Sequence, residues 1–253
     1  MDQVTGYPRY LRPGFTPFDP LELAALTEKV ACSGLSRKYT DFYCVGVYGG
    51  ISTAYTVGCP LRCIFCWVDF SRDFPESHGY FYTPEQAFNR LVRNARKRGL
   101  SKLRISGGEP TLGKEHLLKV LDLIEGTTYL FILETNGLLL GADPDFAVQL
   151  ARFSNLHLRV SLKAGSAEGF QERTRAEGRF RELPYQAVAN LARAGVSFHV
   201  AAMSDPRLMP PAEREDMVRR LQETGYHGYL EEETCDPYRT SIVRLREAGF
   251  EVF

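Results

Sequence analysis

Short stretches rich in β-forming residues alternate with segments of helical periodicity from residue 50 onward. The predicted strands comprise residues 51–57, 102–106, 129–134, 157–161, 196–203 and 229–232. The predicted helices comprise residues 83–98, 114–125, 143–153, 184–194, 212–224 and 240–248. Parallel strands need crossover connections of this kind, so the pattern predicts an α/β fold with a parallel sheet. Six such units are too few for a closed eight-stranded barrel.

Residues 1–49 have a different character. Prolines interrupt their first part, and helical spacing is visible only over residues 20–31. We therefore interpret residues 1–49 as an N-terminal arm with one short helix, and residues 50–253 as one barrel-sized domain. The aromatic residues of the arm are expected either to pack over a barrel opening or to form a surface strap. They are Tyr7, Tyr10, Phe15 and Phe18.

The charges are balanced, with 31 Lys and Arg against 31 Asp and Glu among 253 residues, so no overall field favours nucleic acid or a membrane. The first residues lack an apolar signal core, and no later run approaches the roughly 18 apolar residues of a membrane span. Six cysteines are too sparse for a disulfide framework. We therefore expect a cytoplasmic protein in a reducing compartment, with no membrane partner.

Three of the cysteines lie close together at the spacing Cys-x3-Cys-x2-Cys, and no fourth cysteine or histidine follows closely. They are Cys59, Cys63 and Cys66. A structural zinc site needs four nitrogen or sulfur ligands, and a ferredoxin supplies a fourth cysteine in its run. Neither pattern is present near Cys59. Three thiolates suit a 4Fe-4S cluster with one iron free of protein ligands, and we interpret Cys32 and Cys44 as structural.

Two further motifs follow the cysteines in sequence order. They are Gly107-Gly108-Glu109-Pro110 and Thr135-Asn136-Gly137. Together with the cysteine loop they resemble the radical S-adenosylmethionine (radical SAM) family. The resemblance implies an open, partial (βα)6 TIM-like barrel, a 4Fe-4S cluster on the three cysteines and S-adenosyl-L-methionine (SAM) as a second cofactor. It also implies a reductant of the flavodoxin or ferredoxin type.

The resemblance further implies roles for residues near the first two strand exits. Phe65 and Trp67 would shield the cluster from water, and the backbone around Phe65 would meet the adenine. Gly107 and Gly108 would let the backbone approach a ligand closely, because they lack side chains. Glu109 would then bind the ammonium group of SAM. In isolation, this motif would be interpreted as a tight turn.

The later exits would complete the cofactor site. Thr135 or Asn136 would reach the amino acid part of SAM. Ser161 and Lys163 resemble the Asp-x-Lys of the glycyl-radical-activating branch, with Ser161 in the place of the acid. Strand alternation puts both on the face of Arg159, and Lys163 is a candidate partner for the SAM carboxylate. His199 is either a ribose contact or a core histidine.

The exit of the sixth strand is acidic, with Glu231, Glu232 and Glu233 followed by Cys235. Such a run is usually a solvated face. At a strand end, alternate residues point inward, so Glu231, Glu233 and Cys235 are our candidate catalytic residues, and Glu232 points away. The two acids would be held by a cationic substrate or by a nearby arginine such as Arg159. Cys235 is either a hydrogen-atom donor or a buried free thiol.

The resemblance thus implies an enzyme that cleaves SAM reductively and abstracts hydrogen from a substrate, and the acidic exit favours a cationic group on that substrate. The substrate itself, a small molecule, a peptide or protein, or a tRNA, stays open. A tRNA- or base-modifying enzyme is one alternative, because residues 63–67 resemble the wybutosine branch and residues 90–98 and 173–181 are rich in arginine. Those two stretches are equally typical of solvated helix faces. A non-catalytic iron–sulfur protein for electron transfer or sensing is the alternative from another class.

Overall fold

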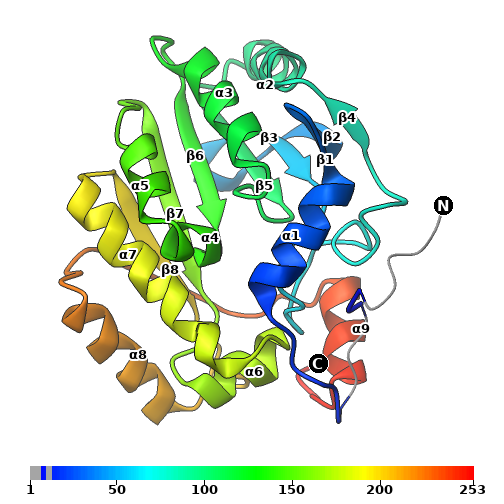
Figure 1. Cartoon of the computed structure of the whole chain (residues 1–253), viewed down its shortest axis with the longest axis vertical. Helices are drawn as coiled ribbons and strands as arrows, with labels where there is room; N and C mark the ends of the chain where they lie inside the picture. The colour runs from blue at the N-terminus through cyan, green and yellow to red at the C-terminus, as the bar shows by residue number, and fades with distance from the viewer. Residues whose placement is uncertain (1–6, 10–12) are drawn as a thin grey trace.

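A curved sheet of nine strands forms the centre of the computed structural model, which describes residues 7–9 and 13–253 (Figure 1). Six strands run parallel in chain order, and all six correspond to predicted strands. They are β3 (Ile51–Thr56), β5 (Lys102–Gly107), β6 (Leu130–Thr135), β7 (Leu156–Leu162), β8 (Phe198–Met203) and β9 (Leu230–Glu233). The predicted α/β fold with a partial parallel barrel is confirmed.

Helices connect these strands, as the alternation predicted, and one more helix, α9, follows the last strand. They are α2 (Pro84–Arg98), α3 (Lys114–Ile124), α4 (Leu138–Ala142), α5 (Pro144–Leu150), α6 (Ala167–Thr174), α7 (Glu182–Ala194), α8 (Pro211–Glu223) and α9 (Arg239–Glu247), with the 3-10 turn η2 (Gly178–Arg181). The sequence did not predict α4, α6 or η2. Helix α2 begins with a capping box, in which Thr83 and Gln86 bond each other's backbone amides, and it ends at the left-handed Gly99.

Three antiparallel strands extend the sheet beyond β3, and the sequence did not predict them. They are β1 (Cys32–Ser33), β2 (Ser36–Val45) and β4 (Tyr80–Tyr82), and they accompany helix α1 (Pro20–Ala31) and the 3-10 turn η1 (Val47–Gly49). Strand β2 was missed because its buried residues include charged ones. Arg37 is 1% exposed, and it donates hydrogen bonds to the carbonyls of Ala31 and Val57 at 3.2 and 2.7 Å. Helix α1 has the predicted bounds.

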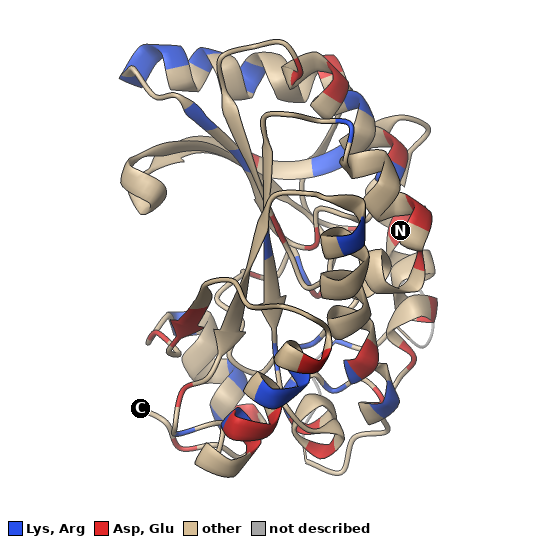
Figure 2. Ribbon diagram, turned by 90° about the vertical axis from the view of Figure 1, so that its left-hand side faces the viewer, with Lys and Arg blue, Asp and Glu red and all other residues tan. Residues whose placement is uncertain are grey.

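Two apolar clusters surround the sheet. The larger lies between the sheet and the helices of its outer face, and Figure 2 shows the sheet from the side with most helices on its right. The smaller lies beneath the cysteine loop and includes Phe65, Phe170 and Leu245. Phe18 of the arm packs against this cluster, and Tyr7 packs on Arg62, whereas Tyr10 lies outside the described residues. Among the described residues, no helix is long and apolar enough to cross a membrane.

Candidate functional site

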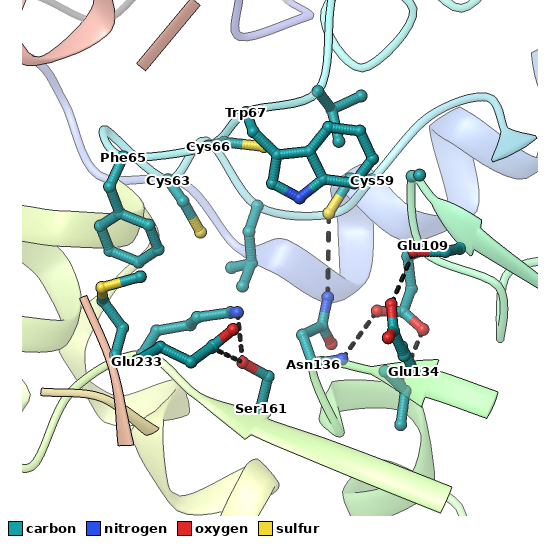
Figure 3. A pocket seen from close by; sticks show the side chains of 18 of the residues that line it. Cys59, Cys63, Phe65, Cys66, Trp67, Glu109, Glu134, Asn136, Ser161 and Glu233 are labelled. Atoms are coloured by element: carbon teal, nitrogen blue, oxygen red, sulfur yellow. Dashed lines mark hydrogen bonds between the residues drawn. The ribbon is translucent and has the colours of Figure 1, made fainter. Parts of the chain in front are cut away.

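A pocket lies at the carboxyl ends of the parallel strands, where sheets of this kind place their chemistry (Figure 3). The predicted site residues that line it are Cys59, Cys63, Phe65, Cys66, Trp67, Gly107, Gly108, Glu109, Thr135, Asn136, Ser161, Lys163, Glu233 and Cys235. Two predicted residues, Glu231 and His199, are not in its lining. Strand exits far apart in the sequence therefore converge on the cysteine loop.

Backbone hydrogen bonds to the end of helix α6 hold the cysteine loop in place. The amides of Arg62 and Ile64 donate hydrogen bonds to the carbonyls of Thr174 and Arg173, both at 3.0 Å. The three cysteines form no disulfide and line the same pocket. The side-chain amide of Asn136 lies 3.8 Å from the sulfur of Cys59 (Figure 3). The loop thus presents three free thiols from a rigid base.

The donor set fits an iron–sulfur cluster better than a single metal ion. Among the residues that the structure describes, no three Cys, His, Asp or Glu side chains are grouped to bind one ion. In a 4Fe-4S cluster each cysteine binds a separate iron, so the sulfurs need not converge on one point. Burial, with smaller contributions from Glu109 and Cys63, raises the pKa of the Cys59 thiol to about 12. Binding to iron would therefore displace the proton of this thiol.

Glu109 joins the exits of β5 and β6. Its Oε1 accepts hydrogen bonds from the amide and hydroxyl of Thr111 and from the hydroxyl of Thr135, at 3.1, 2.7 and 2.7 Å. Its Oε2 accepts one, from the amide of Asn136 at 2.9 Å. A carboxylate oxygen has two lone pairs, so Oε2 keeps capacity for one more donor at the pocket wall. The role of Glu109 toward the SAM ammonium stays a prediction, and this acceptor site is compatible with it.

The two glycines of the β5 exit allow the chain to pack on itself. A Cβ at Gly108 would lie 2.1 Å from the carbonyl oxygen of Gly58, and Gly107 has a φ of +93°. The amide of Glu109 donates to that same carbonyl at 2.8 Å. Close packing against the residue before Cys59 is thus a reason for glycine here that the motif alone did not reveal.

Ser161, Lys163 and Glu233 form a hydrogen-bonded chain on the opposite wall. Lys163 Nζ donates to Ser161 Oγ at 2.6 Å, and Ser161 Oγ donates to Glu233 Oε2 at 3.4 Å (Figure 3). Glu233 belongs to β9, two strands away from β7. A carboxylate from a distant part of the sequence therefore lies beside the serine that replaces the acid of the resembled motif.

Arg159 binds both acids of the β9 exit. Its Nε lies 2.8 Å from Glu231 and its Nη2 lies 2.6 Å from Glu233. The hydrogen bond from Arg159 lowers the pKa of Glu231. Glu232 points to the outer face, as predicted, where it pairs with Arg214 of α8. The structure thus contains the arginine that the sequence suggested for these carboxylates.

His199 lies in a polar network farther from the strand exits. Its Nε2 is 3.0 Å from Glu231, and its Nδ1 is 2.8 Å from Nε2 of His157. Glu231 comes two residues before Glu233 on β9, which explains why neither it nor His199 reaches the pocket lining. Both partners of His199 are therefore protein side chains.

Cys235 is 3% exposed although it contributes to the pocket lining. Its amide donates to Asp205 at 2.8 Å, and its thiol lies 3.8 Å from the carbonyl of Asp236. Burial, with a smaller contribution from Asp205, raises the pKa of this thiol to about 11. Cys235 is therefore a protonated thiol at neutral pH, the form that both of its predicted roles require.

Glu134 lines the pocket although it was not predicted as a site residue. Its carboxylate accepts hydrogen bonds from Tyr48, Arg104 and Ser106 at 2.7, 2.8 and 2.7 Å. Burial alone would raise the pKa of Glu134, but Arg104 and these hydrogen bonds hold it below its usual value. Alternation with Asn136 along β6 was the signal that could have revealed it. Met203 and Tyr238 also line the pocket and carried no such signal.

The chain is similar in sequence to longer curated proteins, and the similarity covers only part of each of them. A GTP 3',8-cyclase of Agrobacterium fabrum is 29% identical over 74% of this chain and 55% of its own length. A GTP 3',8-cyclase of Nitrobacter hamburgensis is 29% identical over 90% of this chain and 66% of its own. The chain therefore spans less than two thirds of the length of these curated relatives.

The solved structure of SuiB from Streptococcus suis bound to the precursor peptide SuiA has the same fold. It covers 73% of this chain and 38% of its own, with a TM-score of 0.59 and 16% identity. The model of the Radical SAM superfamily matches residues 53–221, more than half of the chain, including the cysteine loop and the exits of β5 to β8. The protein therefore belongs to the radical SAM superfamily, whose members are enzymes that use a 4Fe-4S cluster and SAM.

Proposed function

We propose that this enzyme abstracts a hydrogen atom from a substrate that carries a cationic group, bound at a wall formed by Arg159, Ser161 and Glu233. The position of Glu233 is the observation that supports the proposal most directly. It lines the same pocket as the three cysteines, and its side chain is 30% exposed. A carboxylate in this position can accept hydrogen bonds from an incoming ligand.

The charge of the wall favours a cation. Glu231 and Glu233 share one arginine, Arg159, so these three side chains carry one net negative charge. Lys163 lies on the same wall, and the carboxylate of bound SAM would match its charge. An ammonium or guanidinium group would complement the net negative charge and form charge-assisted hydrogen bonds. An anionic group placed there would instead lie beside the carboxylate of Glu233.

The other residues would serve the cofactors. Cys59, Cys63 and Cys66 would hold three irons, and Glu109 and Lys163 would orient the amino acid end of SAM. When bound and reduced, the cluster supplies the electron that splits the sulfonium of SAM and gives a 5'-deoxyadenosyl radical. The buried cluster of apolar side chains around the cysteine loop would exclude water from that radical.

Anaerobic reconstitution of the full chain, followed by SAM and dithionite, tests the proposal through the yield of 5'-deoxyadenosine. We expect amines, guanidino compounds or Lys- and Arg-containing peptides to stimulate that yield, with deuterium transfer from the labelled compound to 5'-deoxyadenosine. Glu233→Gln should weaken the stimulation, whereas the matched control Glu232→Gln, on the outer face, should retain it. Stimulation only by neutral or anionic compounds would overturn the substrate class, and no 5'-deoxyadenosine from a reduced cluster would overturn the reaction.

A nucleotide or an RNA base is the second candidate substrate, and helix α2 is the observation that favours it. Five exposed cations lie on this helix and pair with no acid among the described residues (Figure 2). They are Arg90, Arg93, Arg96, Lys97 and Arg98. The matched relatives are named for a reaction of GTP.

The same assay distinguishes the two candidates. Stimulation of 5'-deoxyadenosine formation by GTP or by tRNA would favour the nucleotide. For tRNA, Arg93→Glu with Lys97→Glu should weaken the stimulation, because phosphate contacts depend on these charges. An unchanged response to tRNA in this double variant would remove α2 from the substrate site.

A further inference from the structure

Three buried arginines lie behind the cysteine loop and outside the pocket lining. They line a small separate cavity together with Ile64. Each arginine donates a hydrogen bond from Nη1 to the backbone carbonyl of one predicted cluster ligand. The pairs are Arg62 with Cys59 at 2.8 Å, Arg72 with Cys63 at 2.8 Å and Arg244 with Cys66 at 2.6 Å. Every ligand therefore has its own guanidinium.

One carboxylate joins the three arginines. Asp73 Oδ1 accepts from Arg72 Nη2 at 2.7 Å, and Asp73 Oδ2 accepts from Arg244 Nη2 at 2.7 Å. The Nε of Arg62 lies 3.8 Å from Oδ1. We call Arg62, Arg72, Arg244 and Asp73 the arginine collar. Its members come from the cysteine loop, the following turn and the distant helix α9.

The collar is sealed from water and carries an excess of positive charge. The side chains of Arg62, Arg72 and Arg244 are 1%, 3% and 6% exposed, and that of Asp73 is 0% exposed. Arginine stays protonated in proteins, so three cations and one carboxylate leave two positive charges. Of the neighbouring charges, Arg9 and Glu76 pair with each other. Asp69 and Glu247 are exposed, so solvent screens them.

We propose that the arginine collar sets the reduction potential of the cluster and raises it. Reduction adds one electron, supplied by the external one-electron reductant, and therefore adds one negative charge to the cluster. A fixed positive charge in a medium of low dielectric constant stabilises that added charge, so the electron is accepted more readily. The hydrogen bonds to the ligand carbonyls orient the same charge toward all three ligating residues.

The composition of the collar distinguishes this role from that of a scaffold. A scaffold would be served by matched charges or by neutral donors, because an unmatched buried guanidinium is costly. Two buried positive charges require an anionic partner, and the loaded cluster provides it, because its three thiolates outweigh the positive charge of its iron–sulfur core. The inference concerns the cluster alone and does not depend on the substrate.

Variants that change the charge in opposite directions test the proposal. Arg244→Gln removes a positive charge and keeps an amide donor, so we expect the midpoint potential of the cluster to become more negative. Asp73→Asn removes the negative charge and keeps the shape, so we expect a less negative potential. Arg214→Gln, on the outer face of α8, is the control and should leave the potential unchanged. The measurement is a redox titration of the reconstituted full chain, followed by electron paramagnetic resonance.

Iron content and thermal unfolding of each variant exclude loss of structure as the cause. Shifts of opposite sign with full iron content would support the collar. Shifts of the same sign, or none, would overturn it. Arg72→Lys keeps the charge and changes the hydrogen-bond geometry, so it should bind iron and shift the potential little. If all three collar variants fail to retain iron, the collar serves to hold the loop and the electrostatic inference is wrong.

Discussion

On the pocket side of the cysteine loop, two partly exposed carboxylates pair with one arginine. Behind the loop, the arginine collar has more cations than carboxylates and is buried away from water. The side chains of Glu231 and Glu233 are 36% and 30% exposed, and both share Arg159. Asp73 is 0% exposed and contacts three arginines. Partly exposed groups can exchange a protein partner for a ligand, and sealed groups impose a fixed field. We therefore expect ligand binding on the pocket side and control of the reduction potential from the collar.

Loss of a ligating cysteine should have the largest effect and should act on both sides at once. We expect Cys59→Ala, Cys63→Ala or Cys66→Ala to abolish cluster binding, because each removes the only protein ligand of one iron. The measurement is the iron and sulfide content after anaerobic reconstitution. Cys32→Ala and Cys44→Ala are the controls and should keep full iron content. Iron loss in Cys32→Ala would mean that the ligand set is different.

Stability should separate the two sides next. Asp73→Ala leaves three buried guanidinium groups without their shared carboxylate, and removal of one partner of a buried ion pair typically costs about 3–5 kcal/mol. Glu233→Ala removes a partly exposed group, and a change within about 1 kcal/mol is expected. Urea unfolding of the cluster-free chain measures both free energies of unfolding. Equal losses of unfolding free energy in the two variants would contradict the division between a sealed collar and a partly exposed pocket side.

The pocket side was largely accessible to sequence reasoning, and the collar was not. Parallel strands end at one edge, so residues at their exits had to converge once the alternation was recognised. Glu109, Asn136 and Lys163 were placed in the pocket in this way. The position along β9 could not be predicted in the same way. Glu231 and Glu233 share a face of the strand, but only Glu233 reaches the pocket lining.

The collar depends on contacts that no local pattern encodes. Arg244 donates to the carbonyl of Cys66 across 178 positions of sequence. In the sequence it is one of several arginines in a helix with an exposed face. Strand β2 was missed for a related reason, since Arg37 and Lys38 suggest a surface segment until tertiary contacts bury them. Buried arginine that bonds to backbone carbonyls is therefore where sequence-based prediction failed, both in the fold and around the site.

Affinity for SAM should respond to the pocket side alone. We expect Glu109→Gln or Lys163→Met to weaken SAM binding by about ten- to a hundredfold, because a lost charge-assisted contact costs about 1.5–3 kcal/mol. Calorimetry on the reconstituted chain measures this, and the iron content should stay at the wild-type level. The matched control is Glu115→Gln at the start of α3. Wild-type affinity in both pocket variants would remove these residues from the cofactor site.

Changes in substrate turnover should be the smallest effect, and only variants on the pocket side should cause them. Neutralising Glu231 or Glu233 to Gln should leave uncoupled SAM cleavage intact and lower turnover of a stimulating substrate by about tenfold, equal to about 1.4 kcal/mol. Glu233→Gln should have the larger effect, because Glu233 lines the pocket and Glu231 acts through Arg159. Cys235→Ala separates two roles on the same wall. A hydrogen-donor thiol would be needed for product formation but not for deuterium transfer into 5'-deoxyadenosine, whereas a structural thiol would affect only the unfolding temperature. Wild-type turnover in all four variants, Glu231→Gln, Glu233→Gln, Cys235→Ala and the control Glu232→Gln, would mean that another wall binds the substrate. The candidate would then be the part of the pocket around Glu134 and Arg104.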